Sequence, residues 1–274
     1  MRASDPLPPE FAEALDPVRP ALGRLGGHIL YFQTIDSTNN VAADLAGAPE
    51  GEGLVVVADA QTAGRGRRGR SWFSPPGSGL YVSVVLAPGR GPHGTRATAL
   101  LTLAAGVALA EAVETVTGLA PEIKWPNDLL VARRKLAGIL AEGHTLEGRS
   151  GPEGFRVVLG FGINVGPAAY PPEIADRATS LEGELGRAVD RGGLFAASLA
   201  ALARRSGDLD AGRFDAILDD WRRRSPGSDG ARVRWQAPEG PRSGVTSGID
   251  ETGALLVRRE GIVERLVAGE VVWA

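Results

Sequence analysis

One long apolar segment, set among short strand-like runs, constrains the fold most. Between residues 95 and 117 apolar side chains recur at helical spacing and the pattern ends at Gly118, which predicts a long core helix. Before this segment, the β-branched run GLVVVADAQ at 53–61 is typical of a buried strand. A chain that combines such a helix with several buried strands is predicted to form an α/β (α+β) fold.

Further elements are predicted on both sides of the long helix. Strand patterns cover 28–35, 80–88, 135–143 and 156–165, and two short strands flank a Pro-Asn-Asp turn within 122–132. Ser37 or Thr38 is positioned to cap a short helix that Gly47 closes, and two helices are expected between 193 and 221.

The composition changes after a Pro-Gly-Ser-Asp-Gly linker at 226–230. Short alternating runs follow, which predict a small β-barrel of the SH3-like kind. We therefore expect three parts: an N-terminal extension (1–27), a large domain (28–225) and a small barrel (226–274). The extension is Pro-rich, weakly helical and too short for a three-helix DNA-reading module.

Composition excludes several classes of protein. The chain has 274 residues and no cysteine, so disulfides and thiolate chemistry are ruled out. Its three histidines are scattered, and its net charge of −3 argues against a nucleic-acid coat protein. No secretory signal pattern is evident, and the apolar stretch 100–113 is interrupted by Glu111 and too short to cross a bilayer. These features predict a soluble, cytoplasmic protein.

Lysine and asparagine are rare, which directs attention to the few that remain. Of 30 basic residues only Lys124 and Lys135 are lysines, and the chain has only four asparagines. The asparagines are Asn39, Asn40, Asn127 and Asn164.

The most basic segment is QTAGRGRRGRSWFSPPG at 61–77. Guanidinium groups bind carboxylates and phosphates with two hydrogen bonds, and glycines allow close approach of the backbone, so the loop suits an anionic small molecule. A solvated surface loop or an RNA-binding Arg/Gly segment is the alternative. The arginines are Arg65, Arg67, Arg68 and Arg70.

The segment KWPNDLL at 124–130 is more specific. Asn127 and Asp128 could simply bond their own backbone in a turn, and Lys135 could simply extend to solvent from its strand. The functional alternative for Lys135 is a fixed ammonium that stabilises charge developing on a phosphate under attack.

Two common catalytic patterns are not met. The run GFGINVG at 160–166 has the wrong glycine spacing for a Rossmann fingerprint, and PAAYPP follows where a helix should begin. No Gly-x-Ser-x-Gly nucleophile elbow occurs. Asn164 could cap a turn or hold a ligand hydroxyl or phosphate.

Taken together, these segments resemble the biotin protein ligases. The matching segments run in family order over nearly the whole chain from residue 28, and the GRGRRG and KWPND…KLAGI pair is highly specific. They are DSTNN (36–40), QTAGRGRRGRSWFSP (61–75), GLYVSVVL (79–86), KWPNDLL (124–130), RKLAGIL (134–140), GFGINV (160–165) and GVTSGIDETGALLV (244–257).

The resemblance implies a mixed-sheet biotin/lipoate ligase-like catalytic domain followed by the small barrel, and it implies roles for individual residues. Biotin would be bound by Ser37, Thr38, Asn39, Gln61, Arg65, Gly66, Arg67, Tyr81 and Lys135. ATP would be bound by Arg67, Arg70, Lys124, Asn127 and Asn164. Catalysis would depend on Lys135, Arg67, Asp128 and Lys124, with Mg²⁺ held largely by the substrate phosphates. Ala178 stands where some members place an aromatic residue over the adenine.

The resemblance also implies an activity. A monofunctional ligase would activate biotin with ATP as biotinyl-5′-AMP and transfer it to a lysine of a biotin carboxyl carrier domain of acetyl-CoA carboxylase or a related carboxylase. The lack of an N-terminal winged helix argues against DNA binding. Two alternatives are a lipoate or octanoate transferase of the same fold and a nucleic-acid-binding protein that uses the Arg/Gly loop.

Overall fold

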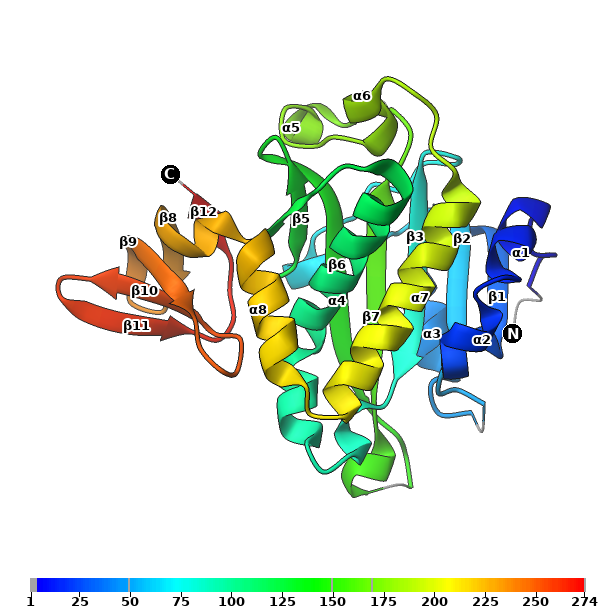
Figure 1. Cartoon of the computed structure of the whole chain (residues 1–274), viewed down its shortest axis with the longest axis horizontal. Coiled ribbons are helices and arrows are strands. Elements are labelled where there is room, and N and C mark those ends of the chain that lie inside the picture. Colours follow the sequence, from blue (N-terminus) through cyan, green and yellow to red (C-terminus); the bar gives the residue numbers. More distant parts are fainter. Residues whose placement is uncertain (1–3, 49, 149, 169, 274) are drawn as a thin grey trace.

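The structure, a computed structural model, describes residues 4–273 except 49, 149 and 169. The first three residues of the predicted extension and the last residue of the predicted barrel therefore lie outside the described residues. A large sheet with helices on both faces carries a smaller, separate sheet at one side (Figure 1).

The large sheet has seven strands in the order β1-β2-β3-β7-β6-β5-β4. The β1–β2 pair is parallel and the other described pairs in this sheet are antiparallel, which confirms a mixed sheet. The predicted strands are all present, as β1 (Ile29–Ile35), β2 (Val55–Gln61), β3 (Gly79–Leu86), β4 (Glu122–Lys124), β5 (Asp128–Val131), β6 (Arg134–Thr145) and β7 (Phe155–Asn164).

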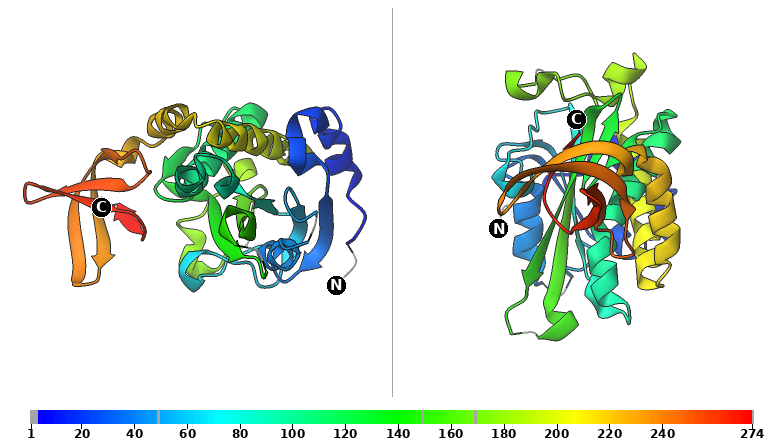
Figure 2. Two further views of the ribbon diagram at one scale, coloured as in Figure 1. Left: turned by 90° about the horizontal axis from the view of Figure 1, so that it is seen from below. Right: turned by 90° about the vertical axis from the view of Figure 1, so that its left-hand side faces the viewer.

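One face of this sheet is covered by a layer of three long helices (Figure 2, left). They are α4 (Gly94–Thr117), α7 (Arg191–Asp210) and α8 (Phe214–Arg224). The long helix predicted at 95–117 is confirmed: Gly118 adopts a left-handed φ of 78° and donates its N–H to the Glu114 carbonyl. Because α4 is apolar on most of its surface, it packs between the sheet and the other two helices.

The opposite face is covered in part by α3 (Thr38–Leu45), which packs on β2, β3 and β7. Ser37 is its N-cap, but the Ser37 side chain accepts no capping hydrogen bond from the described residues. The helix ends at Leu45 with Ala46 as its C-cap, so Gly47 follows the cap as predicted, although it does not adopt a left-handed φ. α3 thus places Ser37, Thr38 and Asn39 at the sheet surface, where all three are buried.

The segment before β1 is part of the core. It forms α1 (Pro9–Leu15), α2 (Arg19–Leu22) and a 3-10 turn, η1 (Gly23–Gly26). The Phe11 ring lies 5.1 Å from that of Phe195 on α7, and a Cβ at Gly192 would lie 2.2 Å from the Glu10 carbonyl oxygen. Glycine at 192 therefore lets α1 dock on α7.

The C-terminal residues form an antiparallel sheet in the order β11-β10-β9-β8-β12, which fits the predicted SH3-like barrel. Its strands are β8 (Asp229–Ala237), β9 (Gly240–Ile249), β10 (Leu255–Arg259), β11 (Ile262–Leu266) and β12 (Val271–Trp273). The predicted linker is shorter than expected, because one 3-10 turn, η5 (Pro226–Ser228), leads directly from α8 to β8. The buried Trp125 indole N–H donates to the Gly253 carbonyl at 3.0 Å, which joins the small sheet to the large domain.

Shorter elements occupy the connections. They are η2 (Arg67–Gly69), η3 (Pro88–Arg90), η4 (Gly151–Gly154), α5 (Pro172–Ala175) and α6 (Leu181–Leu185).

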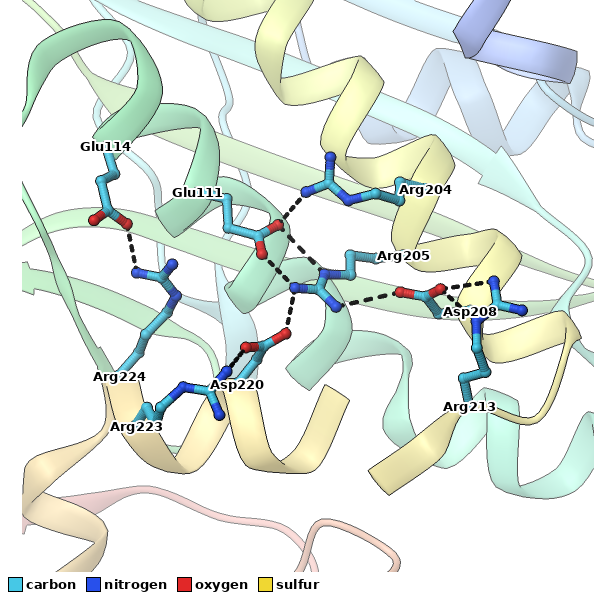
Figure 3. Close-up of polar contacts among 9 residues, drawn as sticks. All are labelled: Glu111, Glu114, Arg204, Arg205, Asp208, Arg213, Asp220, Arg223 and Arg224. Atoms are coloured by element: carbon cyan, nitrogen blue, oxygen red, sulfur yellow. Dashed lines mark hydrogen bonds and ion pairs between the residues drawn. The ribbon is translucent and has the colours of Figure 1, made fainter. Parts of the chain in front are cut away.

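An ion-pair network joins the three covering helices (Figure 3). At its centre the Arg205 guanidinium bonds Glu111 of α4, Asp208 of α7 and Asp220 of α8. Burial alone would lower the pKa of Arg205, but the hydrogen bonds and charges of Glu111 and Asp220 outweigh it, so the pKa is raised. The guanidinium is therefore charged at any pH at which the protein folds.

Helix α4 is, by length and composition, apolar enough to cross a membrane. The expectation that the apolar segment is too short for this, drawn from residues 100–113, is therefore wrong for the complete 24-residue helix. Since 67% of its apolar window is buried inside the protein, α4 is a core helix.

Candidate functional site

The Arg/Gly loop leaves the sheet at the end of β2 and returns to it at β3. It folds back on itself as a hairpin, in which Trp72 N–H donates to the Gly64 carbonyl at 2.8 Å and Gly66 N–H to the Arg70 carbonyl at 2.7 Å. A Cβ at Gly64 would lie 2.4 Å from the Trp72 carbonyl oxygen, so only glycine permits this approach. Arg68 at the tip has a φ of 59°, a left-handed conformation that is strained for a long side chain.

Polar side chains between α3 and the sheet form one connected network. The Gln61 Oε1 accepts from the Thr38 N–H at 2.9 Å, and Gln61 Nε2 donates to the Ser74 hydroxyl at 2.9 Å. The buried Ser83 hydroxyl donates to Asn39 Oδ1 at 2.6 Å and lies 2.8 Å from Thr38 Oγ1. The network fixes the donors and acceptors that α3 presents above the sheet.

A carboxylate links this network to the loop. Asn39 Nδ2 donates to Glu142 Oε2 at 2.8 Å, and the Arg65 guanidinium is paired with the other Glu142 oxygen. Asn39 lies so close to the sheet that a Cβ at Gly160 would be 2.0 Å from its Oδ1. Position 160, on the sheet surface beneath Asn39, must therefore be glycine.

Trp72 occupies the space left by two more glycines. Gly138 and Gly162 are cross-strand partners on β6 and β7, and a Cβ at Gly162 would lie 2.3 Å from the Trp72 indole nitrogen. That nitrogen is buried and has no hydrogen-bond partner among the described residues. A side chain at either glycine would displace the indole ring.

A second group of polar residues surrounds the turn between β4 and β5. The Lys135 ammonium forms an ion pair with Asp128 at 2.7 Å and lies 5.3 Å from the centre of the Trp72 ring. The Arg67 guanidinium donates to Asn127 Oδ1 at 2.9 Å, while Asn127 Nδ2 donates to the Ile139 carbonyl at 2.8 Å. The amide of Asn127 thus holds Arg67 toward Asp128 and Lys135.

Two cations of this group, Lys124 and Arg67, are partly buried, and burial raises the free energy of their charged forms. Lys124 is half-buried, with its ammonium 5.9 Å from the centre of the Trp273 ring. Burial lowers the pKa values of Lys124 and Arg67, and the Asp128 and Glu270 carboxylates offset part of this fall. Cations that have lost hydration and are incompletely neutralised are suited to bind a polyanion.

The remaining predicted residues lie at the edges of the site. Arg70 points to the small barrel and bonds Glu270 with both terminal nitrogens, at 2.9 and 2.6 Å. The buried Tyr81 hydroxyl donates to the Pro75 carbonyl at 3.1 Å, and burial raises the pKa of Tyr81. Asn164 Nδ2 donates to the Thr179 carbonyl at 2.9 Å, so its amide supports the 165–180 loop.

The predicted residues thus form two groups, one at α3 and one at the β4–β5 turn, with Arg65 reaching the first and Arg67 the second. Sequence analysis did not single out Trp72, Ser83, Glu142 or Glu270. Gly138 and Gly162 could have indicated a close approach at this point of the sheet, because a glycine within a strand often marks the place where a ligand or another part of the chain comes near. Among the described residues, no group of three or more His, Asp or Glu is placed to hold a metal ion.

Similarity to known proteins identifies the family. Residues 31–164 match the model of the Biotin/lipoate A/B protein ligase family. The chain is 35% identical over 249 residues to the bifunctional ligase/repressor BirA of Bacillus subtilis, covering 90% of this chain and 74% of that protein. It is 35% identical over 241 residues to the biotin–[acetyl-CoA-carboxylase] ligase of Paracoccus denitrificans, covering 86% of this chain and 96% of that protein.

A solved structure agrees with these relatives. The biotin protein ligase from Aquifex aeolicus, in complex with biotin and ATP, superposes with a TM-score of 0.75 and 28% identity, covering 90% of this chain and 99% of that one. The family model, the relatives and the shared fold lead to one conclusion: this chain belongs to the biotin protein ligases of the biotin/lipoate A/B protein ligase family.

Proposed function

We propose that this protein activates biotin with ATP to form biotinyl-5′-AMP and pyrophosphate, and then transfers biotin to one lysine of a carrier domain. The observation that carries the proposal is the group of cations at the β4–β5 turn, Arg67, Lys124 and Lys135, which lies beside the space that Trp72 fills. The matched relatives are named as biotin ligases, one of them also as a repressor, so lipoate transfer and a protein that only binds nucleic acid are not favoured.

The chemistry requires neutralisation of negative charge, because a carboxylate has to approach a triphosphate. A carboxylate oxygen of biotin attacks the α-phosphorus, the bond to the β-phosphate oxygen breaks, and pyrophosphate leaves. Lys135 would hold both reacting anions, and Arg67 and Lys124 would stabilise the charge that grows on the phosphates. Their burial strengthens each interaction relative to water.

The biotin ring would be recognised by the network at α3. Ser37, Thr38, Asn39 and Gln61 offer fixed amide and hydroxyl groups for the ureido ring, and Tyr81 would stand on the pocket wall. Arg65 and Gly66 would close the loop over the bound vitamin. Arg70 and Asn164 would contribute to the nucleotide side, beside Asn127.

Magnesium would be held mainly by the substrate. Asp128 supplies one carboxylate next to Lys135, and Mg²⁺ in nucleotide sites commonly takes one or two protein carboxylates together with phosphate oxygens and water. The donor set therefore fits a phosphate-bound Mg²⁺, whose chemistry would be to neutralise phosphate charge.

In the second step, the amine of the acceptor lysine attacks the carbonyl of the mixed anhydride. The amide bond forms, the bond to phosphate breaks and AMP leaves.

We propose a biotin carboxyl carrier domain of acetyl-CoA carboxylase or a related carboxylase as the acceptor, and the cytoplasm as the compartment. Helices α1 and α2 pack on α7, so the residues before β1 form part of the catalytic layer. We assign catalysis to 28–225, the small barrel to 226–274, and 1–27 to an N-terminal extension.

The direct test uses labelled biotin and MgATP. Formation of an acid-labile biotinyl-adenylate, followed by labelling of a single carrier lysine, is the expected result. Lipoate or octanoate in place of biotin should yield no adenylate. A protein that releases no pyrophosphate with biotin, or that prefers lipoate, would refute the proposal.

Ligand binding is expected to protect the Arg/Gly loop from proteolysis. Between Gly64 and Ser74 the loop carries three glycines and four arginines, and its ion pairs to Glu142 and Glu270 are partly exposed and therefore weak, so the hairpin is expected to open readily until an anion binds. Limited trypsin digestion should cut within this loop, and saturating biotin should suppress that cut. Cleavage at the same rate with and without biotin would show that the loop does not close over the ligand.

Arg67→Gly is expected to release the intermediate. The variant loses a charged donor toward the phosphate while the α3 network stays intact, a loss of roughly 1.5–3 kcal/mol. The adenylate should therefore dissociate about ten- to a hundredfold faster and label amines of bystander proteins. The measurement is the adenylate off-rate together with biotin incorporation into an unrelated protein; an unchanged off-rate and labelling confined to the carrier would contradict the role of Arg67.

A further inference from the structure

The small barrel contributes one acidic side chain to the group of cations. Glu270 lies in the connection between β11 and β12 and accepts two hydrogen bonds from Arg70, at 2.9 and 2.6 Å. The contact joins residues 200 positions apart. It is a paired, planar arrangement, the same one that a guanidinium makes with two oxygens of a phosphate.

The charge of Glu270 acts on more than its hydrogen-bond partner. The Arg70 hydrogen bonds lower the pKa of Glu270, and the charges of Lys124 and Lys135 lower it further. Conversely, Glu270 opposes the burial that lowers the pKa values of Lys124 and Arg67. One carboxylate therefore neutralises part of the positive charge of the whole group.

The contact is too exposed to serve as a strong tie between the domains. The Arg70 and Glu270 side chains are 67% and 37% exposed, and ion pairs of this kind contribute about 0–1 kcal/mol. An anion with several charges can therefore displace the carboxylate at little cost. A cleft of about 480 Å³ lies between the large domain and the barrel and is lined by Arg67, Pro126 and Val267, but not by Arg70 or Glu270.

We propose that Glu270 is an internal competitor of the nucleotide phosphates: its carboxylate takes the place of a phosphate on Arg70 and has to leave before the nucleotide binds fully. The inference rests on the proposed function, because it assigns the cation group to ATP. It also gives the small barrel a part in the first half-reaction. Glu270 acts through Arg70 and the neighbouring lysines and is not itself a catalytic residue.

The test measures phosphate binding directly. Glu270→Gln keeps the shape of the side chain and removes its charge. Calorimetric titration of the biotin-free protein with inorganic tripolyphosphate, and with an ATP analogue that has a methylene bridge between the α- and β-phosphates, should show about five- to tenfold tighter binding by the variant. The gain should shrink in 0.5 M KCl, because salt screens exposed charges. Adenosine, which has no phosphate, should bind equally to both proteins.

The kinetic signature is a KM effect. In adenylate formation with saturating biotin, Glu270→Gln should lower KM for ATP without raising kcat. Glu264→Gln is the matched control, because Glu264 is a barrel carboxylate paired with Arg242 at 2.9 Å and lies 3.8 Å from Arg259. Its substitution removes the same charge outside the cation group and should leave phosphate binding unchanged.

Three results would overturn the proposal: unchanged binding in Glu270→Gln, weaker binding, or equally tight binding in the control. Weaker binding would show that Glu270 positions Arg70 for the nucleotide instead of competing with it. The titrations use no biotin, so they report on Glu270 even if the wild-type protein forms no biotinyl-adenylate. That second failure would be visible separately, in the adenylate assay.

Discussion

Lys135→Ala is expected to slow biotinyl-adenylate formation about a hundredfold. The variant removes the ammonium that would hold both reacting anions, and a single fixed donor at a developing charge contributes roughly 3 kcal/mol. The fold should survive, because the Asp128 carboxylate, which loses Lys135 as its partner, still lies near the positive charges of Arg67 and Lys124. The measurement is single-turnover adenylate formation, with circular dichroism to confirm the fold.

The neighbouring residue supplies the control for this prediction. Arg134 is a half-exposed cation paired with Glu184 at 2.7 Å, and Arg134→Ala removes a positive charge one residue away. We expect adenylate formation by this variant within about twofold of the wild-type rate, since exposed ion pairs contribute little. If Lys135→Ala is folded and as fast as Arg134→Ala, Lys135 has no role in the reaction.

The second large effect concerns stability. Arg205→Met is expected to lower the free energy of unfolding by about 3 kcal/mol, near the lower end of the range for breaking a buried ion pair. The value is not higher because the three carboxylates keep other partners, Arg204, Arg213 and Arg223 (Figure 3). Urea unfolding of the ligand-free protein measures the change.

Arg213→Met tests whether burial decides the size of that effect. Arg213 pairs with Asp208 at 2.8 Å in the same network, but its side chain is 58% exposed. We expect this variant to lose less than about 1 kcal/mol. Equal losses in the two variants would contradict the view that the buried guanidinium joins the helices.

Local patterns were sufficient to predict most of the elements. The helix 95–117 and the strands of the large sheet follow from the periodicity of apolar side chains, which records which face of each element is buried. The strand order β1-β2-β3-β7-β6-β5-β4 does not, because it depends on contacts between residues far apart in sequence. The 226–230 linker was predicted too long, because its last two residues, Asp229 and Gly230, already form the start of β8 in the barrel.

The proximity of some predicted site residues is visible in the structure: Arg67 contacts Asn127, and Asp128 pairs with Lys135. The roles that the family resemblance implies for them stay predictions. Glu270 could not be found, because a single glutamate in a turn of the barrel carries no local signal and its partner Arg70 is 200 positions away.

The two glycines beneath Trp72, on β6 and β7, have a consequence for redesigning the proposed biotin site. Gly138 and Gly162 have no side chain to remove, so every substitution at these positions can only reduce the space beneath Trp72. Trp72 is the opposite case, since any replacement adds space above the same two glycines. If biotin binds at the proposed site, a ligase that accepts a biotin analogue carrying an extra chemical handle is expected from varying Trp72 and its loop, while the two strands are left unchanged.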